Sequence, residues 1–365
     1  MKKQLLALAA FTAVSGMASA QSSVTIYGLM DTGLVKETGS DLKMAQFHAS
    51  RIGFKGSENL GSGYKAIFQL EKRFTVNNGE MSGVDWEGAS NVGLAGPFGT
   101  VRLGRVNEIE TESFSRMDPF GEDGIASILL STQHFWRISN TIRYDSPVFN
   151  GFYLNATYTL GTNTDKKSRD EYGDTLKQYG ADNDGYALSL NYDNGPLLLL
   201  ANFSRPSDSN NSTIWSVGGA YKFGGLRVAL GYEKTDDKGW KPHATGSAFS
   251  NKLEGVRSKQ DSYVLSADYT TGPHKVAAAF NYMKVKDIKA GEGSGNNSDF
   301  LNGYDSGDAK KYSIGYFYNL SKRTMLYGQL AYTDFEDKTL ARFFRGSKVD
   351  GDSVTGASIG IDHKF

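Results

Sequence analysis

The feature that most constrains this chain is a repeated alternation of apolar and polar side chains, in segments of about ten residues. In 225–235, for example, Leu226, Val228 and Leu230 alternate with small or charged residues. Successive side chains of a β-strand point to opposite faces, so this spacing puts the apolar residues on one face. The sequence predicts sixteen such strands, near 23–36, 45–57, 62–77, 84–96, 98–105, 134–145, 150–161, 184–194, 196–205, 213–223, 225–235, 260–270, 273–285, 309–320, 323–336 and 353–365.

The connections between these segments alternate between short and long. Short ones carry turn residues, as in Asn194-Gly195-Pro196 and Thr271-Gly272-Pro273. An antiparallel up-and-down sheet has one set of turns at each end, so the asymmetry is typical of a transmembrane β-barrel with short periplasmic turns and long extracellular loops. A soluble sandwich has no reason to produce it. The long connections are 106–134, 162–183, 206–212, 236–259, 286–308 and 337–352.

The polar faces of the segments are small or charged, which suits a water-filled lumen better than a packed core. The chain holds 20 Tyr and 21 Phe, yet its mean hydropathy is −0.42. Many of these aromatic residues lie toward the segment ends, among them Tyr27, Tyr158 and Tyr269. We interpret them as aromatic girdles at the two membrane interfaces.

Residues 1–20 are predicted to be a cleaved signal peptide, and 21–365 to be the barrel domain. Lys2 and Lys3 form a charged start, an apolar run follows, and Ala18-Ser19-Ala20 is a small-residue cleavage site. The apolar run is too short for a membrane anchor helix, and so is the longest other one, Pro196 to Ala201. There are no cysteines, so hydrogen-bonded strands and burial alone must hold the exported chain together.

The remaining composition argues against several functions. The formal net charge is zero, which leaves no footprint for binding nucleic acid. No metal site, no cofactor and no enzymatic activity are predicted, because the sequence has no G-x-S-x-G elbow and no phosphate-binding glycine loop. A catalytic dyad of His134 with nearby acids is the weaker interpretation of that residue. The histidines are scattered without metal-ligand spacing, at His48, His134, His243, His274 and His363.

The last segment ends on an aromatic residue. Phe365, His363 and Ile361 share one face of the predicted final strand. This ending resembles the terminal signature by which outer-membrane barrels are recognised for insertion. The sequence therefore predicts a Gram-negative outer-membrane location and a contact between Phe365 and the barrel assembly machinery.

With these residues in view, the chain resembles the general porins of Gram-negative bacteria such as Neisseria and Bordetella. The similar runs are Ser23 to Gly28, Ser50 to Gly61, Phe98 to Arg105 and Asn140 to Pro147. The resemblance implies an outer-membrane porin: a homotrimer of sixteen-stranded barrels, embedded in outer-membrane lipid, through which small hydrophilic solutes and ions diffuse passively. Two alternatives remain at this point: a barrel that acts mainly as a surface adhesin or receptor through its long loops, and a barrel enzyme.

One stretch, Gly99 to Pro147, is predicted to control the pore. Its motif Asp118-Pro119-Phe120-Gly121 resembles the tip of the porin third loop, which folds into the barrel and narrows it. Arginines whose alternation points them inward are expected to form a basic wall opposite the loop acids, so that a transverse field acts on permeating solutes. The predicted wall is Arg51, Arg73, Arg102, Arg137 and Arg143, and the predicted acids are Glu110, Glu112 and Asp118.

One position departs from the family pattern. Members often carry an arginine where this chain has Gly88, and Glu87 stands beside it here. A missing lumen arginine next to an acid argues against strong anion selectivity. The sign of the selectivity, the preferred solute and any voltage gating stay open.

Overall fold

The structure is a computed structural model that describes residues 23–81, 85–121, 124–128, 136–161, 183–207, 209–239, 256–289, 303–345 and 351–365, without the side chains of Phe343 and Arg345. The predicted signal peptide lies outside the described residues. Among those residues, no helix has both the length and the apolar character needed to cross a membrane.

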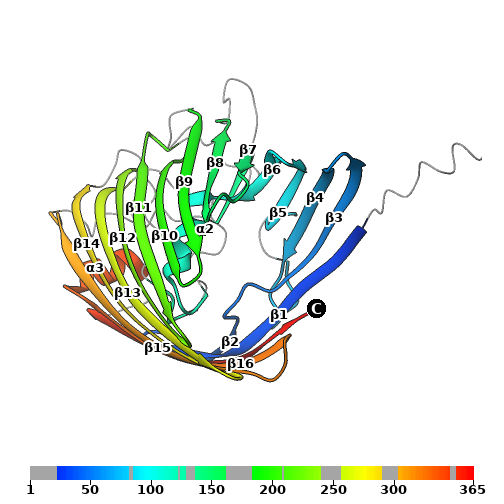
Figure 1. The fold of residues 1–365 in the computed structure, drawn as a ribbon. Helices are drawn as coiled ribbons and strands as arrows, with labels where there is room; N and C mark the ends of the chain where they lie inside the picture. The colour runs from blue at the N-terminus through cyan, green and yellow to red at the C-terminus, as the bar shows by residue number, and fades with distance from the viewer. Residues whose placement is uncertain are drawn as a thin grey trace, which may run out of the picture.

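The strands form one antiparallel sheet that closes on itself, because β1 pairs with both β3 and β17 (Figure 1). The predicted 16-stranded antiparallel β-barrel is therefore confirmed. Its strands are β1 (Ser23–Glu37), β3 (Arg51–Gly61), β4 (Tyr64–Arg73), β5 (Ala89–Gly96), β6 (Gly99–Asn107), β7 (Arg137–Asp145), β8 (Phe152–Thr159), β9 (Gly185–Asn194), β10 (Leu197–Arg205), β11 (Thr213–Phe223), β12 (Leu226–Lys238), β13 (Arg257–Thr271), β14 (His274–Lys289), β15 (Gly307–Asn319), β16 (Thr324–Phe335) and β17 (Ser353–Lys364).

The sequence misplaced the second predicted strand, 45–57. The structure divides it into two strands. The short strand β2 (Lys43–Ala45) pairs with residues 33–35 of β1, and β3 pairs with residues 23–29. Between them the chain turns into the barrel at 46–50. The carboxylate of Asp31 accepts a hydrogen bond from the Phe47 backbone N–H, and the Ser50 side chain accepts one from the Asp31 backbone N–H. These side chain–backbone bonds replace strand pairing, and no periodicity in the sequence signals them.

The outer wall is apolar, as the alternation predicts. Tyr312 and Ile314 are each 50% exposed on the outside, whereas the intervening Ser313 is 7% exposed and faces inward. Tyr27 is an exception to the predicted girdles, since its hydroxyl donates to Glu71 inside the barrel. Its neighbour Ile26 takes the outer face instead.

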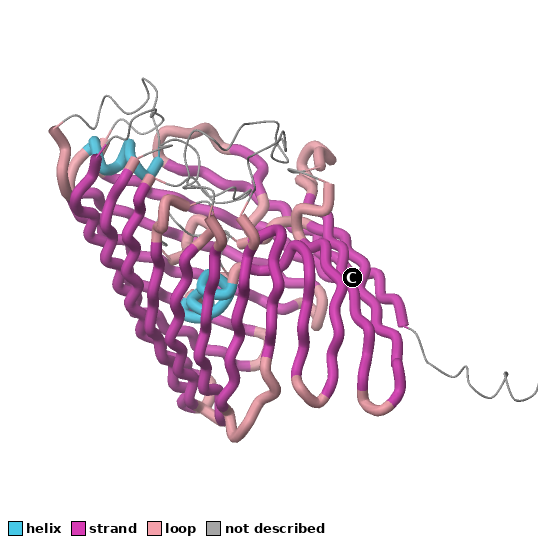
Figure 2. The backbone as a smooth tube through the Cα atoms, turned by 90° about the horizontal axis from the view of Figure 1, so that it is seen from above, coloured by secondary structure: helices cyan, strands magenta, loops and turns pink. Residues whose placement is uncertain are grey.

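The long connection between β6 and β7 lies inside the ring of strands (Figure 2). It contains the helix α2 (Ile109–Phe114) and the single turn η1 (Ser115–Met117), which contact β9 to β12. Phe114, Met117 and Phe120 belong to the main buried apolar cluster, together with side chains of the wall such as Leu200 and Phe317. A second helix, α3 (Lys338–Arg345), packs on β15 and β16 near the end that carries the long loops (Figure 2).

Candidate pore constriction

The segment between β6 and β7, residues 108–136, is called the third loop below. It starts as a helix because Glu108 provides an N-cap: its Oε2 accepts a hydrogen bond from the Thr111 backbone N–H at 2.7 Å. Its other oxygen accepts one from the Ser204 hydroxyl of β10 at 2.8 Å. The same carboxylate therefore begins the helix and fixes it to the wall.

The wall strands leave room for the third loop by placing glycines beneath it. A Cβ on Gly231 would lie 2.9 Å from the Phe114 ring, and one on Gly218 would lie 2.8 Å from the Met117 sulfur. Cβ atoms do not approach other atoms so closely, so a side chain at either position would displace Phe114 or Met117 from its present place.

Three cations of the far wall also hold the third loop through its backbone carbonyls. Arg227 donates to the carbonyl of Arg116, Lys275 to that of Pro119, and Lys311 to that of Ser127. They come from β12, β14 and β15, so successive parts of the loop are tied to different strands. Charged donors make stronger bonds than neutral ones, so this pattern fixes the path of the loop across the lumen.

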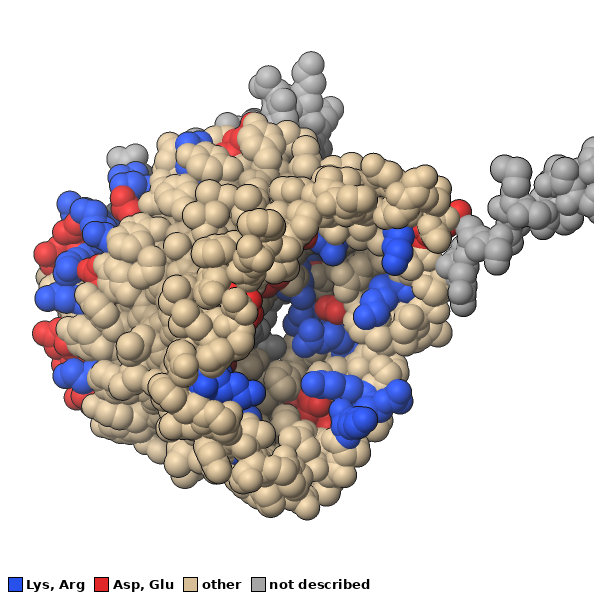
Figure 3. Space-filling model, in the orientation of Figure 1, with Lys and Arg blue, Asp and Glu red and all other residues tan. Residues whose placement is uncertain are grey.

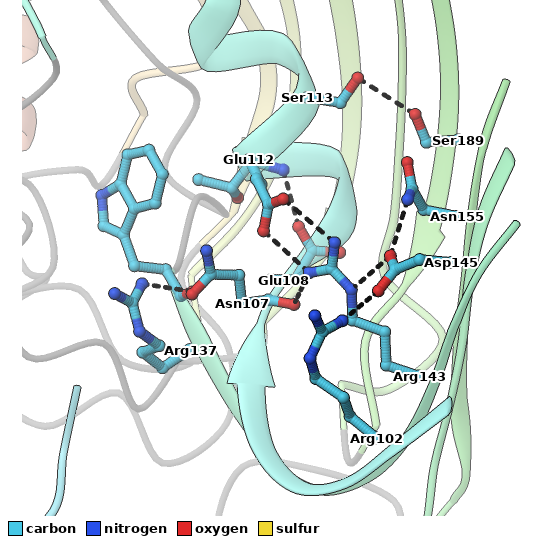
Figure 4. A network of polar contacts seen from close by, with 12 residues as sticks. Arg102, Asn107, Glu108, Glu112, Ser113, Arg137, Arg143, Asp145, Asn155 and Ser189 are labelled. Atoms are coloured by element: carbon cyan, nitrogen blue, oxygen red, sulfur yellow. Dashed lines mark hydrogen bonds and ion pairs between the residues drawn. The ribbon is translucent and has the colours of Figure 1, made fainter. Parts of the chain in front are cut away.

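On the near wall, Arg143 of β7 meets Glu112 of α2 in a two-bond ion pair (Figure 4). Its Nη1 is 2.8 Å from Oε2, and its Nη2 is 3.0 Å from Oε1. The Nε of Arg143 donates to Asp145, which also pairs with Arg102. Burial of Glu112 raises its pKa, but the hydrogen bonds and charge of Arg143 outweigh burial and hold the pKa below its usual value.

A second group of arginines lies beside this pair. Arg73 and Arg137 both approach Glu71, with nitrogen–oxygen distances of 3.6 and 3.7 Å. Arg51 and Arg105 also act electrostatically on Arg137. We call Arg51, Arg73, Arg105 and Arg137 the arginine cluster; Figure 3 shows Lys and Arg gathered around the opening of the barrel.

Gly88 and Glu87 lie behind the arginine cluster. A Cβ on Gly88 would lie 2.4 Å from Glu71 Oε1, so Glu71 fills the space that a side chain here would need. The carbonyl of Gly88 accepts a bond from Arg137. Glu87 is 2% exposed, and burial raises its pKa although Lys72 and three arginines oppose the shift. The carboxylate of Glu87 is thus shielded from the water of the lumen.

The structure separates the three predicted loop acids. Glu112 contacts Arg143, as described. Glu110 is fully buried against β11, where it accepts a bond from the Ser216 hydroxyl at 2.6 Å. Asp118 accepts from the Phe120 backbone N–H at 2.8 Å and so shapes the turn at the loop tip. The five predicted arginines all lie on β3, β4, β6 and β7, within the run of strands from β3 to β7, in which β5 separates β4 from β6.

Sequence reasoning missed two members of this site. The alternation places Glu71 on the lumen face with Arg73, but the sequence did not single it out as a site residue. Arg105 has the outward parity of Leu103, and only a register irregularity between Gly104 and Val106 allows it to bond Ser139 and the carbonyl of Glu87. His134, weighed above as a catalytic residue, lies outside the described residues.

The chain end closes the barrel. The backbone groups of Phe365 and Gly28 exchange hydrogen bonds of 3.0 and 3.1 Å, which joins the end of the chain to β1. Phe365 and Ile361 are 43% and 41% exposed, and His363 bonds Thr324 at 2.9 Å. Recognition of this ending during insertion stays a prediction.

A closed barrel with an apolar outer wall, a charged lumen and a loop folded across it defines an outer-membrane channel. Comparison with known proteins gives the family. Residues 7–338 match the sequence profile described as "Gram-negative porin", so the chain belongs to the Gram-negative porin family, and the resemblance found in the sequence is confirmed.

Two relatives match over their whole length. Outer membrane porin protein 32 of Delftia acidovorans is 30% identical over 394 residues, covering 100% of both chains. An outer membrane porin of Bordetella pertussis is 30% identical over 418 residues, again covering 100% of both chains. The protein is thus an integral β-barrel of the outer membrane with a channel function, and a main role as an adhesin is not favoured.

Solved structures agree on the fold. An anion-selective porin from Comamonas acidovorans superposes with a TM-score of 0.70 at 24% identity, covering 94% of this chain and 100% of that one. OmpF of Salmonella typhi, in complex with daunomycin, gives a TM-score of 0.66 at 19% identity, covering 96% and 99%.

Proposed function

We propose that the channel passes small hydrophilic solutes and ions by diffusion, and that it is no enzyme. The narrow part of the passage lies between the arginine cluster, with Arg102 and Arg143, and the third loop. The observation that carries this proposal is the ion pair of Arg143 with Glu112, since it holds the loop helix directly against the basic wall.

The charges of this region favour anions. Glu87 is buried, and Glu71 is shared by Arg73 and Arg137, so neither acid offsets the cluster fully in the lumen. Glu112 is paired with Arg143, which offsets part of its negative charge. A local excess of positive charge concentrates anions and lowers their barrier relative to cations. We therefore infer a moderate anion preference, which agrees with the expectation from Gly88 that strong anion selectivity is absent.

We also propose a homotrimer. The outer wall is apolar around the barrel, so three copies can pack side by side in lipid, and Vibrio cholerae OmpT, with a TM-score of 0.63, has been solved in a form described as a trimer. Phe365 is proposed to present the chain to the barrel assembly machinery. No ligand, cofactor or nucleic acid is needed for the proposed transport.

Recording from single insertions in planar bilayers tests the proposal. We expect ohmic currents that close in three equal steps. In a potassium chloride gradient, the reversal potential should have the sign that chloride permeation gives. A folded barrel that inserts without conducting would refute the channel. A cation-selective reversal potential would refute the proposed charge balance while leaving the channel intact.

A further inference from the structure

The lumen carries a second group of titratable side chains, at the seam where the first and last strands meet. Asp31 of β1 and Asp362 of β17 are direct register partners, and each is 1% exposed. His48, from the inward turn at 46–50, lies beside both. We call Asp31, His48 and Asp362 the seam cluster. Two carboxylates buried this close repel each other unless positive charge lies between them.

The two carboxylate oxygens of Asp31 differ in their hydrogen bonds. Its Oδ1 accepts hydrogen bonds from the Phe47 backbone N–H at 2.8 Å and from the Tyr327 hydroxyl at 2.9 Å. Its Oδ2 is buried and has no hydrogen-bond donor among the described residues. The Nδ1 of His48 is 3.8 Å from this oxygen, and the same nitrogen is only 2.9 Å from Asp362 Oδ2. One oxygen is therefore held in place while the other points, unbonded, into the cluster.

We propose that the seam cluster binds one divalent transition-metal ion of the Zn²⁺ class. Its donors are one imidazole nitrogen and two carboxylate oxygens, a set that suits Zn²⁺, Co²⁺ or Ni²⁺ better than Ca²⁺ or Mg²⁺. The ligand atoms lie within 4.8 Å of one another. An ion with bonds of about 2.0 to 2.2 Å spans ligand atoms up to roughly 4 Å apart, so a slight contraction completes the site.

The surroundings fit a metal site in two further respects. Ligating carboxylates are usually oriented by outer hydrogen bonds, and the bonds of Phe47 and Tyr327 to Asp31 Oδ1 supply these. The His48 side chain is 20% exposed, so an ion can enter from the water of the lumen. Coordination of an ion by Nδ1 of His48 would replace the hydrogen bond between this nitrogen and Asp362.

The position of the site gives the ion a structural role. It would tie β1 to β17 where the barrel closes, and it would fix the 46–50 turn between them. Gly121 at the tip of the third loop lies against the other nitrogen of His48, since a Cβ there would be 2.8 Å from Nε2. The bound ion thus connects the closing seam with the tip of the loop that crosses the pore.

Co²⁺ binding to the purified, detergent-solubilised full barrel tests this inference. After chelator treatment, Co²⁺ titration is expected to produce visible absorption that saturates at one ion per chain and is displaced by Zn²⁺. His48→Ala should weaken binding more than tenfold. The matched control is His363→Ala, which removes a histidine next to Asp362 in the sequence, at a side chain that bonds Thr324 instead.

Folding is checked separately, by circular dichroism and by the mobility of unheated samples in gels. His48→Gln, which keeps a polar side chain of similar length but is a poor ligand, should fold and bind no Co²⁺. The proposal is overturned if wild-type protein binds no ion, or binds it equally well after His48→Ala. It is also overturned if Zn²⁺ leaves thermal stability unchanged while His48→Ala lowers it, because the hydrogen bond between His48 and Asp362 would then hold the seam without an ion.

Discussion

Arg143 and Glu112 join the barrel wall to the third loop through two parallel hydrogen bonds of 2.8 and 3.0 Å. The pair is asymmetric in exposure: the arginine side chain is 9% exposed and the glutamate side chain 39%. The arginine is also oriented by Asp145, at 2.8 Å from its Nε. The glutamate therefore both anchors the helix and presents negative charge to the passage.

Glu112→Gln should increase the anion preference of the channel. The substitution removes one negative charge from the passage and leaves Arg143 with Asp145 as its acidic partner. A unit charge acts with about 1 kcal/mol at 4 Å in water, so the anion-to-cation permeability ratio should rise by at most about fivefold. Reversal potentials in a salt gradient measure it, with the exposed Glu58→Gln as control. A shift toward cations would contradict the assignment of Glu112 to the passage.

The same ion pair predicts how the pore responds to acid. The pKa of Glu112 is lowered by Arg143. The stabilisation from ionised Glu112 is therefore fully present above the ordinary glutamate pKa near 4.5, and it is lost as the pH falls through the lower pKa of the folded state. Single-channel current noise, a measure of loop motion, should therefore stay constant from pH 7 to about 4.5 and rise only in stronger acid. Glu112→Gln should remove this acid transition. A rise that begins above pH 5 in the wild type would exclude this pair as its cause.

Neutralising the basic wall should have the opposite effect on selectivity. Arg137→Gln removes a charge from the arginine cluster and leaves Glu71 with Arg73 as its neighbour, so the reversal potential should move toward cations. Arg143→Gln should move it the same way, again by at most about fivefold in permeability ratio. Arg323→Gln, in a short turn, serves as the control. An unchanged reversal potential would place these arginines outside the constriction.

The two lysines that anchor the third loop should limit the current noise of the open channel. Lys275→Met and Lys311→Met each remove a charged donor from a loop carbonyl, a loss of about 1.5 to 3 kcal/mol. We expect stronger current fluctuations and a lower thermal midpoint in detergent. Lys222→Met makes the same chemical change at an exposed position. If the protein with both Lys275→Met and Lys311→Met showed the same current noise and thermal midpoint as this control, the lysines would have no role in holding the loop.

Local pattern was enough to predict the strands and the faces. The period of two along a strand is set by backbone geometry, and it correctly placed Leu226 and Ile314 outside and Ser313 inside. The same rule pointed all five predicted arginines inward, and they lie within the run of strands from β3 to β7. It failed at Arg105 and at residues 46–50, where a register irregularity and side chain–backbone hydrogen bonds interrupt the strand.

The sequence by itself determined that this chain is a membrane barrel with a charged lumen, because alternation and turn length are local properties. Only the tertiary structure decided which acid meets the basic wall. Glu110 and Glu112 are two residues apart on one helix, and rotation by about 200° sends one into β11 and the other to Arg143. The tertiary structure also brings the seam cluster together, since His48 and Asp362 are 314 positions apart in the sequence and meet only when the barrel closes.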